Sequence, residues 1–242
     1  MRIATWNCQG GLARKQAAIA ELEPDVLVVP ESARPVGWNG ALGADAVRSV
    51  EWVGENPRKG LAAISFGDYS LRVHESYEPS HRWVLPLVVE GPFPFTLFAV
   101  WTVPHLESRF YVQCLFDSLE TYRGILAGPR VIWAGDFNNN PLLDKPRHAL
   151  KFSDLVERMR ELGLRSLYHA QTSEAHGGEA NPTFYLQRKV GKPHHIDYIV
   201  ASRDICELEF EVSVGTHSKW SKWSDHMPLV ASIRERSPGE GS

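Results

Sequence analysis

Short apolar segments that resemble β-strands recur along this sequence, and polar residues able to carry chemistry lie directly beside them. The segment VIW at 131–133 has the character of a buried strand, so Asp136 should emerge at its carboxyl end, where open sheets place their ligands. Other polar residues stand in equivalent positions: Asn7 and Gln9 after RIATW, Glu31 after DVLVVP, Asn138 after VIWAG, His195 and Asp197 in HHIDYIV, and Asp225 and His226 before MPLVASI. If these strand ends converge, the fold is built on sheets and the polar residues form one pocket.

The amino-terminal part of the chain predicts a β-α-β unit followed by antiparallel strands. Residues 2–7 and 25–31 have strand character, and residues 12–23 between them are helix formers that stop before Pro24. Residues 48–103 contain short apolar or alternating runs separated by Gly, Pro, Asn and Asp, a pattern typical of strands joined by turns.

Two helices and four strands are predicted in the rest of the chain. Residues 107–126 have apolar side chains at the helical period, and residues 153–164 have an apolar face that follows Ser153, a predicted N-cap. Strands return in PTFYL, HHIDYIVAS, CELEFEVSV and LVASI. Because two stretches each mix strands with a helix, we expect an α/β fold of two sheets packed face to face with helices outside.

The length and composition favour one domain. The chain has 242 residues, of which 43% are hydrophobic, and this is enough to bury a substantial core. We find no internal repeat at the level of residues. The expected organisation is a single domain over residues 1–235, followed by a flexible tail at 236–242.

Composition also bears on location and partners. No apolar run approaches the roughly 20 residues of a membrane span, and the amino terminus lacks signal-peptide character, so we expect a cytoplasmic monomer without membrane insertion. Cys8, Cys114 and Cys206 form no CxxC pair, which argues against a disulfide framework and a thiolate zinc site. A net charge of −3 gives no general attraction to a polyanion, so any contact with nucleic acid must come from local basic groups.

The types of polar residue at the strand ends indicate a metal. Carboxylate and amide oxygens with one or two histidines suit Mg²⁺ or Mn²⁺ better than a structural zinc ion. Magnesium in proteins works with substrate phosphates, which points to phosphoryl-ester chemistry. Each residue also has an ordinary interpretation: Asn7 and Gln9 as turn residues, Glu31 as a solvated strand end, and GDFNNNP as an Asx-rich turn.

Five segments taken in order resemble a known family. NCQGG, PES, GDFNNNP, HHIDYIVAS and SDHMPLVASI resemble the signatures of the endonuclease/exonuclease/phosphatase superfamily, which includes exonuclease III-like and deoxyribonuclease I-like enzymes. The resemblance spans residues 3–233. It implies a four-layer α/β/β/α sandwich of two packed mixed sheets with outer helices.

The resemblance also implies roles for individual residues. Glu31 matches the metal-binding glutamate of the superfamily, with Asn7 and Asp225 as ligands directly or through water. The expected cofactor is Mg²⁺ or Mn²⁺.

Four further residues match the catalytic groups of the superfamily. Asp136 matches the aspartate that orients or deprotonates the attacking water, and Asn138 matches the amide that helps to hold water or phosphate. His226 matches the histidine that hydrogen-bonds the scissile phosphate, and Asp197 matches the carboxylate that orients this histidine. A carboxylate beside His226 favours the imidazolium form, which stabilises negative charge in the transition state.

Substrate contacts are expected from loops around the pocket. Where abasic endonucleases have a Tyr-Val-Pro stretch, this chain has WTVPH, so the tyrosine that contacts phosphate is replaced by Thr102 or displaced to Trp101. The loops QRKVGKPHH and KWSKWSDH combine cations with aromatic rings that can grip phosphate and stack a base, although both also fit solvated basic loops. The predicted substrate-binding residues are Gln9, Thr102, His105, His195 and Trp223.

The sequence therefore predicts a divalent-metal-dependent phosphodiester hydrolase, with a nuclease acting on DNA or RNA as the leading expectation. A small-molecule phosphatase or phosphodiesterase, acting on a lipid head group or a sugar phosphate, is the first alternative. A catalytically inactive binding module is the second, and the complete set of matched residues argues against it.

Overall fold

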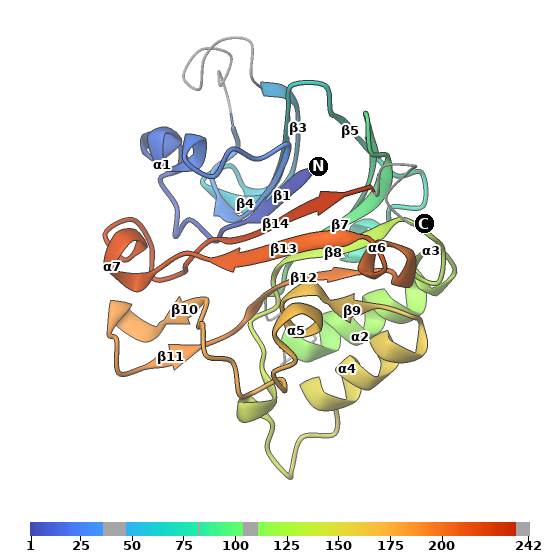
Figure 1. The fold of residues 1–242 in the computed structure, drawn as a ribbon, viewed down its shortest axis with the longest axis vertical. Helices are drawn as coiled ribbons and strands as arrows, with labels where there is room; N and C mark the ends of the chain where they lie inside the picture. Colours follow the sequence, from blue (N-terminus) through green and yellow to red (C-terminus); the bar gives the residue numbers. More distant parts are fainter. Residues whose placement is uncertain (36–46, 82, 104–110, 236–242) are drawn as a thin grey trace, which may run out of the picture.

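The computed structural model describes residues 1–35, 47–81, 83–103 and 111–235. Two six-stranded sheets form the centre of this part of the chain (Figure 1). The predicted tail at 236–242 and the predicted substrate-binding residue His105 lie outside the described residues.

The first sheet has the strand order β13-β14-β1-β2-β4-β3. Its strands are β1 (Arg2–Thr5), β2 (Val26–Ser32), β3 (Val47–Asn56), β4 (Lys59–Phe66), β13 (Glu209–Val214) and β14 (Leu229–Arg234). β1 and β2 are parallel, and the other neighbours in this sheet are antiparallel. The sheet is therefore mixed, and its one parallel pair belongs to the β-α-β unit predicted from the sequence.

The second sheet has the strand order β5-β6-β7-β8-β12-β9. Its strands are β5 (Ser70–Val73), β6 (Val84–Glu90), β7 (Phe95–Trp101), β8 (Val131–Asp136), β9 (Arg165–Ser166) and β12 (Asp197–Ala201). β7 and β8 are parallel and the other neighbours are antiparallel. A separate hairpin pairs β10 (Phe184–Tyr185) with β11 (Pro193–His194).

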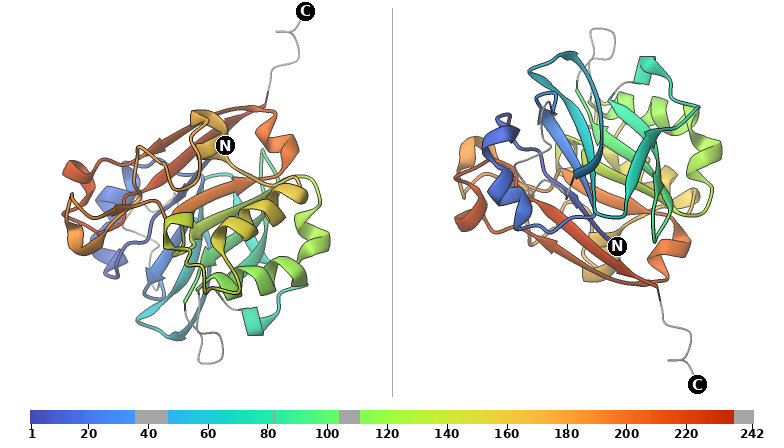
Figure 2. Two further views of the ribbon diagram at one scale, coloured as in Figure 1. Left: turned by 90° about the horizontal axis from the view of Figure 1, so that it is seen from below. Right: turned by 90° about the horizontal axis from the view of Figure 1, so that it is seen from above.

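The two sheets pack face to face around a shared apolar core. Alternate residues of the strands, such as Ile3, Val28, Leu97 and Ile199, point into this core and are fully buried. Figure 2 shows the sheets side by side, with helices on their outer faces. These layers confirm the predicted α/β/β/α sandwich.

The helices divide between the outer faces and the edges of the sandwich. Residues of α2 (Tyr111–Thr121), α3 (Arg123–Leu126) and α4 (Phe152–Glu161) cover the second sheet, and residues of η1 (Leu12–Arg14), α1 (Gln16–Ala20) and α7 (His217–Trp220) cover the first. α5 (Leu167–Thr172) and α6 (Arg203–Cys206) contribute residues to the core between the sheets. The remaining short helices are η2 (Pro79–His81), η3 (Pro141–Leu143) and η4 (Leu186–Arg188).

The structure corrects the predicted helices locally. The helix expected over 12–23 is divided into η1 and α1, and the helix expected over 107–126 is divided at Tyr122 into α2 and α3 within its described part. Ser153 is not the N-cap of α4, because the helix begins one residue earlier. The carboxylate of Asp144 instead accepts the backbone N–H groups of Phe152 and Ser153, at 2.7 and 3.0 Å, and so satisfies the free donors of the first turn.

The antiparallel strands predicted over residues 48–103 are present, but they belong to different sheets. β3 and β4 pair in the first sheet, whereas β5, β6 and β7 pair in the second. The chain therefore crosses between the two layers after β4, a step that strand periodicity alone does not reveal.

The topology brings the ends of five strands to one edge of the sandwich. β1 and β2 are parallel, and β14 runs antiparallel to β1 with Leu229 opposite Thr5, so the residues before β14 lie beside those that follow β1. In the second sheet, Asp197 at the start of β12 is opposite Asp136 at the end of β8. The polar residues singled out in the sequence are therefore gathered at this edge. Within the described residues, no helix is long and apolar enough to cross a membrane.

Candidate active site

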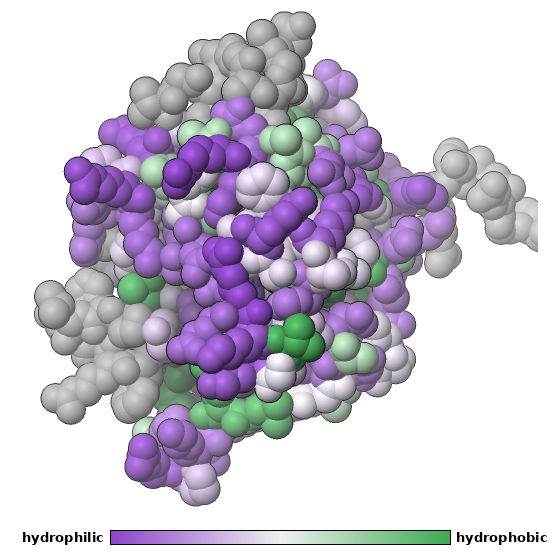
Figure 3. Space-filling model, turned by 90° about the vertical axis from the view of Figure 1, so that its left-hand side faces the viewer, coloured by the Kyte–Doolittle hydropathy of each residue, from purple (hydrophilic) through white to green (hydrophobic). Residues whose placement is uncertain are grey.

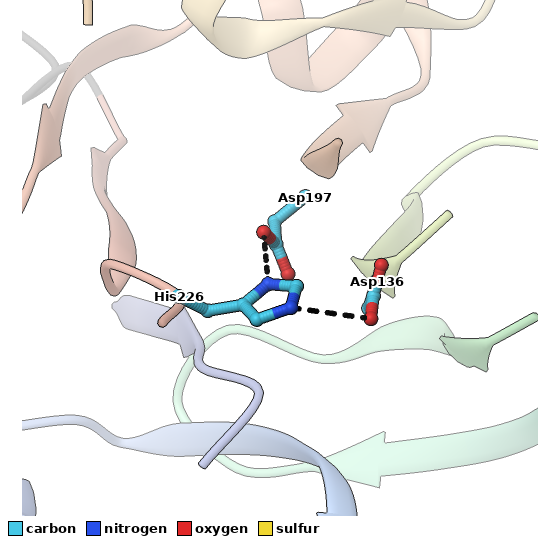
Figure 4. A group of neighbouring side chains, drawn as sticks. All are labelled: Asp136, Asp197 and His226. Carbon is cyan, nitrogen blue, oxygen red and sulfur yellow. Dashed lines mark hydrogen bonds and ion pairs between the residues drawn. The ribbon is translucent and has the colours of Figure 1, made fainter. Parts of the chain in front are cut away.

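Three buried side chains form the centre of the site. The Nδ1 atom of His226 lies 2.8 Å from Oδ2 of Asp197, and its Nε2 atom lies 3.9 Å from Oδ2 of Asp136. Figure 4 shows the imidazole between the two carboxylates. The first distance is a hydrogen bond, whereas the second is too long for one and leaves room for a bridging oxygen atom.

Asp136 is held by amide groups from two parts of the chain. Its Oδ2 accepts hydrogen bonds from the side-chain amides of Asn7 and Asn138 at 2.8 and 3.0 Å, and its Oδ1 accepts the backbone N–H of Asn138 at 2.9 Å. Asn138 has a left-handed backbone, with φ +49°, which turns its side chain back towards Asp136. The arrangement fixes the direction of the carboxylate.

Asp197 is also positioned through its backbone. The hydroxyl of Thr183 accepts the N–H groups of Ile196 and Asp197, both at 3.0 Å. Among the described residues, the buried Oδ1 atom of Asp197 has no hydrogen-bond partner. Since a buried carboxylate oxygen rarely stays unpaired, this atom marks a place for a water molecule, an ion or a substrate group.

The loop that carries His226 is tied to the first strand. The hydroxyl of Ser224 donates to the backbone carbonyl of Asn7 at 2.7 Å and accepts the N–H of His226 at 3.0 Å. The indole of Trp6 donates to the carbonyl of His226 at 2.9 Å. The ring of Phe184 packs against the imidazole of His226, with the two ring centroids 4.6 Å apart. These contacts join the first sheet to a histidine that faces the second sheet.

Burial and mutual charge set the protonation states of this centre. Burial acts to lower the pKa of His226, but the carboxylates of Asp197 and Asp136 outweigh it and raise this pKa to about 9. Burial and the negative charge of Asp197 raise the pKa of Asp136 to about 7, against the opposing effect of His226. At neutral pH the imidazole is therefore protonated, and the arrangement is suited to donating a hydrogen bond to an anion.

The structure brings together one group of residues that could hold a metal ion, and the sequence predicts another. The ligand atoms of Asp136, Asp197 and His226 lie within 4.8 Å of one another. A protonated His226 has no free lone pair, however, and its Nδ1 already faces Asp197. This group is therefore better suited to proton chemistry than to metal coordination.

The second group is the predicted set Glu31, Asn7 and Asp225. Glu31 ends the apolar part of β2 with a left-handed backbone, φ +57°, and its carboxylate lies 3.3 Å from Nζ of Lys59. Asp225 accepts a hydrogen bond from the side chain of Gln9 at 3.0 Å, and the amide of Asn7 bridges to Asp136. All three side chains offer oxygen donors, and these are the ligands that a hard divalent cation prefers.

Tyr111 is a candidate that the sequence analysis missed. It is the first residue of α2 and is 39% exposed. Partial burial raises the pKa of its phenol, and the carboxylates of Asp136 and Glu31 add to this effect. The helical period assigns Tyr111 to an apolar helix face, and the resemblance directs attention to residues 101–105 instead. Its position as the first residue of α2, the first helix after β7, is the signal that could have identified it.

The other predicted substrate-binding residues lie partly in the protein interior and partly at the rim of the site. The hydroxyl of Thr102 is buried and donates to the carbonyl of Phe137 at 2.7 Å, and the ring of His195 is buried with Nδ1 2.9 Å from the carbonyl of Asn181. Trp223 packs partly against the outer core of the first sheet. Gln9 lies at the rim, where the guanidinium of Arg188 donates to its side-chain oxygen.

The surface around this edge is polar. Figure 3 shows the side of the molecule that carries α1, α7 and the β10–β11 hairpin, and its described residues are predominantly hydrophilic. Among them are cations of the two loops singled out in the sequence, including Arg188 and Lys222, and a hydrogen bond of 3.3 Å links Arg188 to the carbonyl of Lys222. An anionic substrate would meet positive charge here, although the net charge of the chain is negative.

The fold and the site define a class: α/β/β/α sandwich proteins in which polar residues gather where the strands of both sheets end. A sequence model of the Endonuclease/Exonuclease/phosphatase family matches residues 4–226. The chain therefore belongs to this family.

Solved structures with the same fold include DNA-processing proteins. The 3′–5′ exonuclease NExo from Neisseria meningitidis is similar, with a TM-score of 0.72 and 19% identity over 96% of this chain and 99% of that one. A structure of the 3′ phosphatase NExo from Neisseria bound to a product DNA hairpin has a TM-score of 0.72 and 19% identity, over 97% and 99%. An AP endonuclease from Archaeoglobus fulgidus has a TM-score of 0.65 and 21% identity, over 96% and 99%. A search of curated proteins found no match.

Proposed function

We propose that this protein is a divalent-metal-dependent phosphodiester hydrolase, and specifically a nuclease acting on DNA or RNA. The observation that carries the proposal is the position of His226 between two buried carboxylates, 2.8 Å from Asp197 and 3.9 Å from Asp136. One carboxylate holds the ring and raises its basicity, and the other faces the opposite nitrogen across a gap that an oxygen atom can fill.

In this proposal Asp136 orients the attacking water and accepts its proton. The amides of Asn7 and Asn138 keep the carboxylate in one orientation, so little reorganisation is needed when water attacks phosphorus. The attack forms a new P–O bond and breaks the ester bond on the opposite side, in line. Because burial raises the pKa of Asp136 to about 7, it is a stronger base than an ordinary aspartate.

His226 stabilises the charge that develops on phosphate. Its Nε2–H donates to a non-bridging oxygen, and Asp197 keeps the ring protonated and correctly turned. The site thus places a hydrogen-bond donor and a base around one position.

The proposed metal is Mg²⁺ or Mn²⁺, held by Glu31 with Asn7 and Asp225 directly or through water. The oxygen-only donor set fits such a cation, and the unpaired Oδ1 of Asp197 leaves further acceptor capacity at the site. When bound, the ion supplies positive charge that neutralises the phosphate and the leaving oxygen.

Nucleic acid is the substrate favoured by the surroundings. Arg188 and Lys222 lie beside the Gln9–Asp225 pair, and Lys222 lies 5.4 Å from the ring of Trp223. Cations next to an indole suit a phosphate followed by a base. The similar 3′ phosphatase NExo was solved with a product DNA hairpin, which is consistent with this choice. The net charge of −3 supports the second candidate, a phosphoesterase of small molecules.

A substrate panel tests the proposal. Single-stranded DNA, duplex DNA, duplex DNA with an abasic site, RNA and bis(4-nitrophenyl) phosphate are incubated with Mg²⁺, Mn²⁺ or EDTA. We expect EDTA-sensitive cleavage of at least one polynucleotide. Turnover of bis(4-nitrophenyl) phosphate alone would favour a phosphoesterase of small molecules over a nuclease. No turnover of any substrate with either metal would contradict both functions.

A further inference from the structure

A cavity lies on the outer side of the second sheet, away from the proposed catalytic residues. It has a volume of about 260 Å³ and is lined by residues of α4, β9, α5, β12 and the following loops (Figure 1). Along β12, side chains alternate between the two faces, so Tyr198 and Val200 line this cavity while Asp197 faces His226 on the other side. None of the proposed catalytic or metal-binding residues lines the cavity.

One wall of the cavity is made of flat rings. The imidazoles of His169 and His176 are stacked, with centroids 3.6 Å apart and an angle of 4° between their planes. The ring of Tyr198 is nearly parallel to both, at 21° and 24°. Phe152 and Met159 of α4 contribute apolar surface. Because the two imidazoles cover each other's inner faces and Tyr198 is buried, the surface that can accept another planar ring is the outer face of the stacked pair.

The polar groups of this wall are satisfied except for one ring. His169 is fixed on both sides, by the hydroxyl of Ser166 at 2.8 Å and the carboxylate of Glu179 at 3.1 Å. Glu179 also accepts the N–H of Gly177 at 2.9 Å, so its charge is engaged within the protein. In the part of the chain that the structure describes, the imidazole of His176 makes no hydrogen bond, which leaves its nitrogens to a ligand.

Positive charge completes the cavity. Arg160 and Arg165 both line it, and Arg160 is paired with Glu157 at 3.0 Å. No carboxylate belongs to the lining among the described residues. Arg165 therefore offers positive charge to an anionic group, whereas the charge of Arg160 is shared with Glu157.

We propose that this cavity is a binding site for a small planar aromatic ring that carries an anionic group. The ring stacks on the outer face of the His169–His176 pair, and the nitrogens of His176 are its hydrogen-bond partners. The anionic group is directed towards Arg160 and Arg165. A nucleoside monophosphate and an aromatic carboxylate share this chemistry. The site does not depend on the proposed nuclease activity.

Isothermal titration calorimetry with three kinds of compound tests the site. Adenosine and cytidine 5′-monophosphates and indole-3-carboxylate carry a ring with an anion, adenosine and cytidine carry the ring alone, and ribose 5-phosphate carries the anion alone. EDTA is present, so that nothing is hydrolysed by a metal-dependent reaction. We expect the ring-with-anion compounds to bind and the separate parts to bind at least about tenfold more weakly. Whether the monophosphates, the carboxylate or both bind shows which kind of anionic ring compound the cavity accepts. No binding of any, or equal binding of ribose 5-phosphate, would contradict the proposal.

Variants locate the binding in the cavity. His176→Ala removes part of the flat wall and is expected to weaken binding about fivefold to tenfold, because ring contacts contribute roughly 1 kcal/mol. His176→Phe keeps a flat ring and should bind more tightly than His176→Ala. Arg165→Gln should weaken binding of the anionic compounds only, and Arg72→Gln, a solvent-exposed arginine of β5 paired with Glu90, is the matched control. Unchanged affinity in both His176→Ala and Arg165→Gln, with circular dichroism confirming the fold, would place any binding elsewhere.

Discussion

Nδ1 of His226 lies 2.8 Å from Oδ2 of Asp197, and both side chains are buried. The two residues come from different sheets, since Asp197 begins β12 and His226 precedes β14. Their hydrogen bond therefore exists only when the two layers of the sandwich are packed in the correct register. It fixes the ring so that Nε2 is directed towards Asp136, and the proposed reaction depends on this direction.

Replacing the carboxylate of Asp197 should reduce turnover while the protein remains folded. Asp197→Asn keeps the size of the side chain but removes the charge that favours the imidazolium. We expect kcat/KM for the cleaved polynucleotide to fall about 100-fold or more, in the range of general acid–base contributions. Initial rates measured at saturating Mg²⁺ provide the check, and thermal unfolding verifies the fold. Near-native turnover in Asp197→Asn would remove the proposed role of this residue.

The pH dependence of kcat/KM should be bell-shaped. The deprotonated fraction of Asp136 rises with pH through a pKa of about 7, and the protonated fraction of His226 falls with pH through a pKa of about 9. Activity is therefore highest between these values. In Asp197→Asn the alkaline limb should move to lower pH, because the carboxylate that raises the pKa of His226 is lost. An alkaline limb that stays in place would show that it belongs to another group.

Glu31 should control the response to metal. In Glu31→Gln we expect the Mg²⁺ concentration at half-maximal activity to rise about tenfold or more, since one anionic oxygen ligand is lost. A metal titration of initial rates measures this. Glu90→Gln, which changes an exposed glutamate that pairs with Arg72, is the matched control and should leave the titration unchanged. If the two variants behave alike, Glu31 is an ordinary strand-end residue.

Gly135 should be necessary for the approach of β7 to β8. Its φ of +151° is one that other residues rarely adopt, and a Cβ atom there would overlap the carbonyl of Val100. Gly135→Ala is expected to lower the free energy of unfolding by about 3 kcal/mol or more. Gly124→Ala in α3, where a Cβ has open space, should instead change stability by less than about 1 kcal/mol, in the stabilising direction. Chemical denaturation of both variants makes the comparison, and a Gly135→Ala protein as stable as Gly124→Ala would contradict the packing argument.

The sandwich and the polar strand ends could be predicted because both follow from local patterns. The apolar run before Asp136 has strand character by itself, and the order of the five motifs marks the family. Pairing across the molecule could not be predicted in this way. That Asp197 lies opposite Asp136 depends on β8 and β12 being neighbours, although 60 residues of intervening sequence make several other elements.

Residues that act through tertiary contacts were the ones missed. Thr183 and Ser224 position Asp197 and His226 through single hydroxyl groups. Ser224 stands in the SDHMPLVASI motif, but the motif does not reveal that its hydroxyl contacts the backbone of Asn7. The cap of α4 was misassigned for the same reason, since Asp144 reaches the helix from eight residues away. The helical period indicates that Tyr111 belongs to a helix. It does not indicate which surface of the protein the side chain faces.

The most direct test of the central claim is cleavage of a polynucleotide by the purified protein, compared with His226→Gln in the same assay. Gel analysis of end-labelled single-stranded and duplex DNA and of RNA, with Mg²⁺ and with EDTA, gives the rate and the product ends. We predict cleavage of at least one polynucleotide by the wild-type protein with Mg²⁺, loss of this cleavage in EDTA, and a rate at least about 100-fold lower in the folded His226→Gln variant. Cleavage that persists in EDTA, or that is equally fast in His226→Gln, would contradict the account.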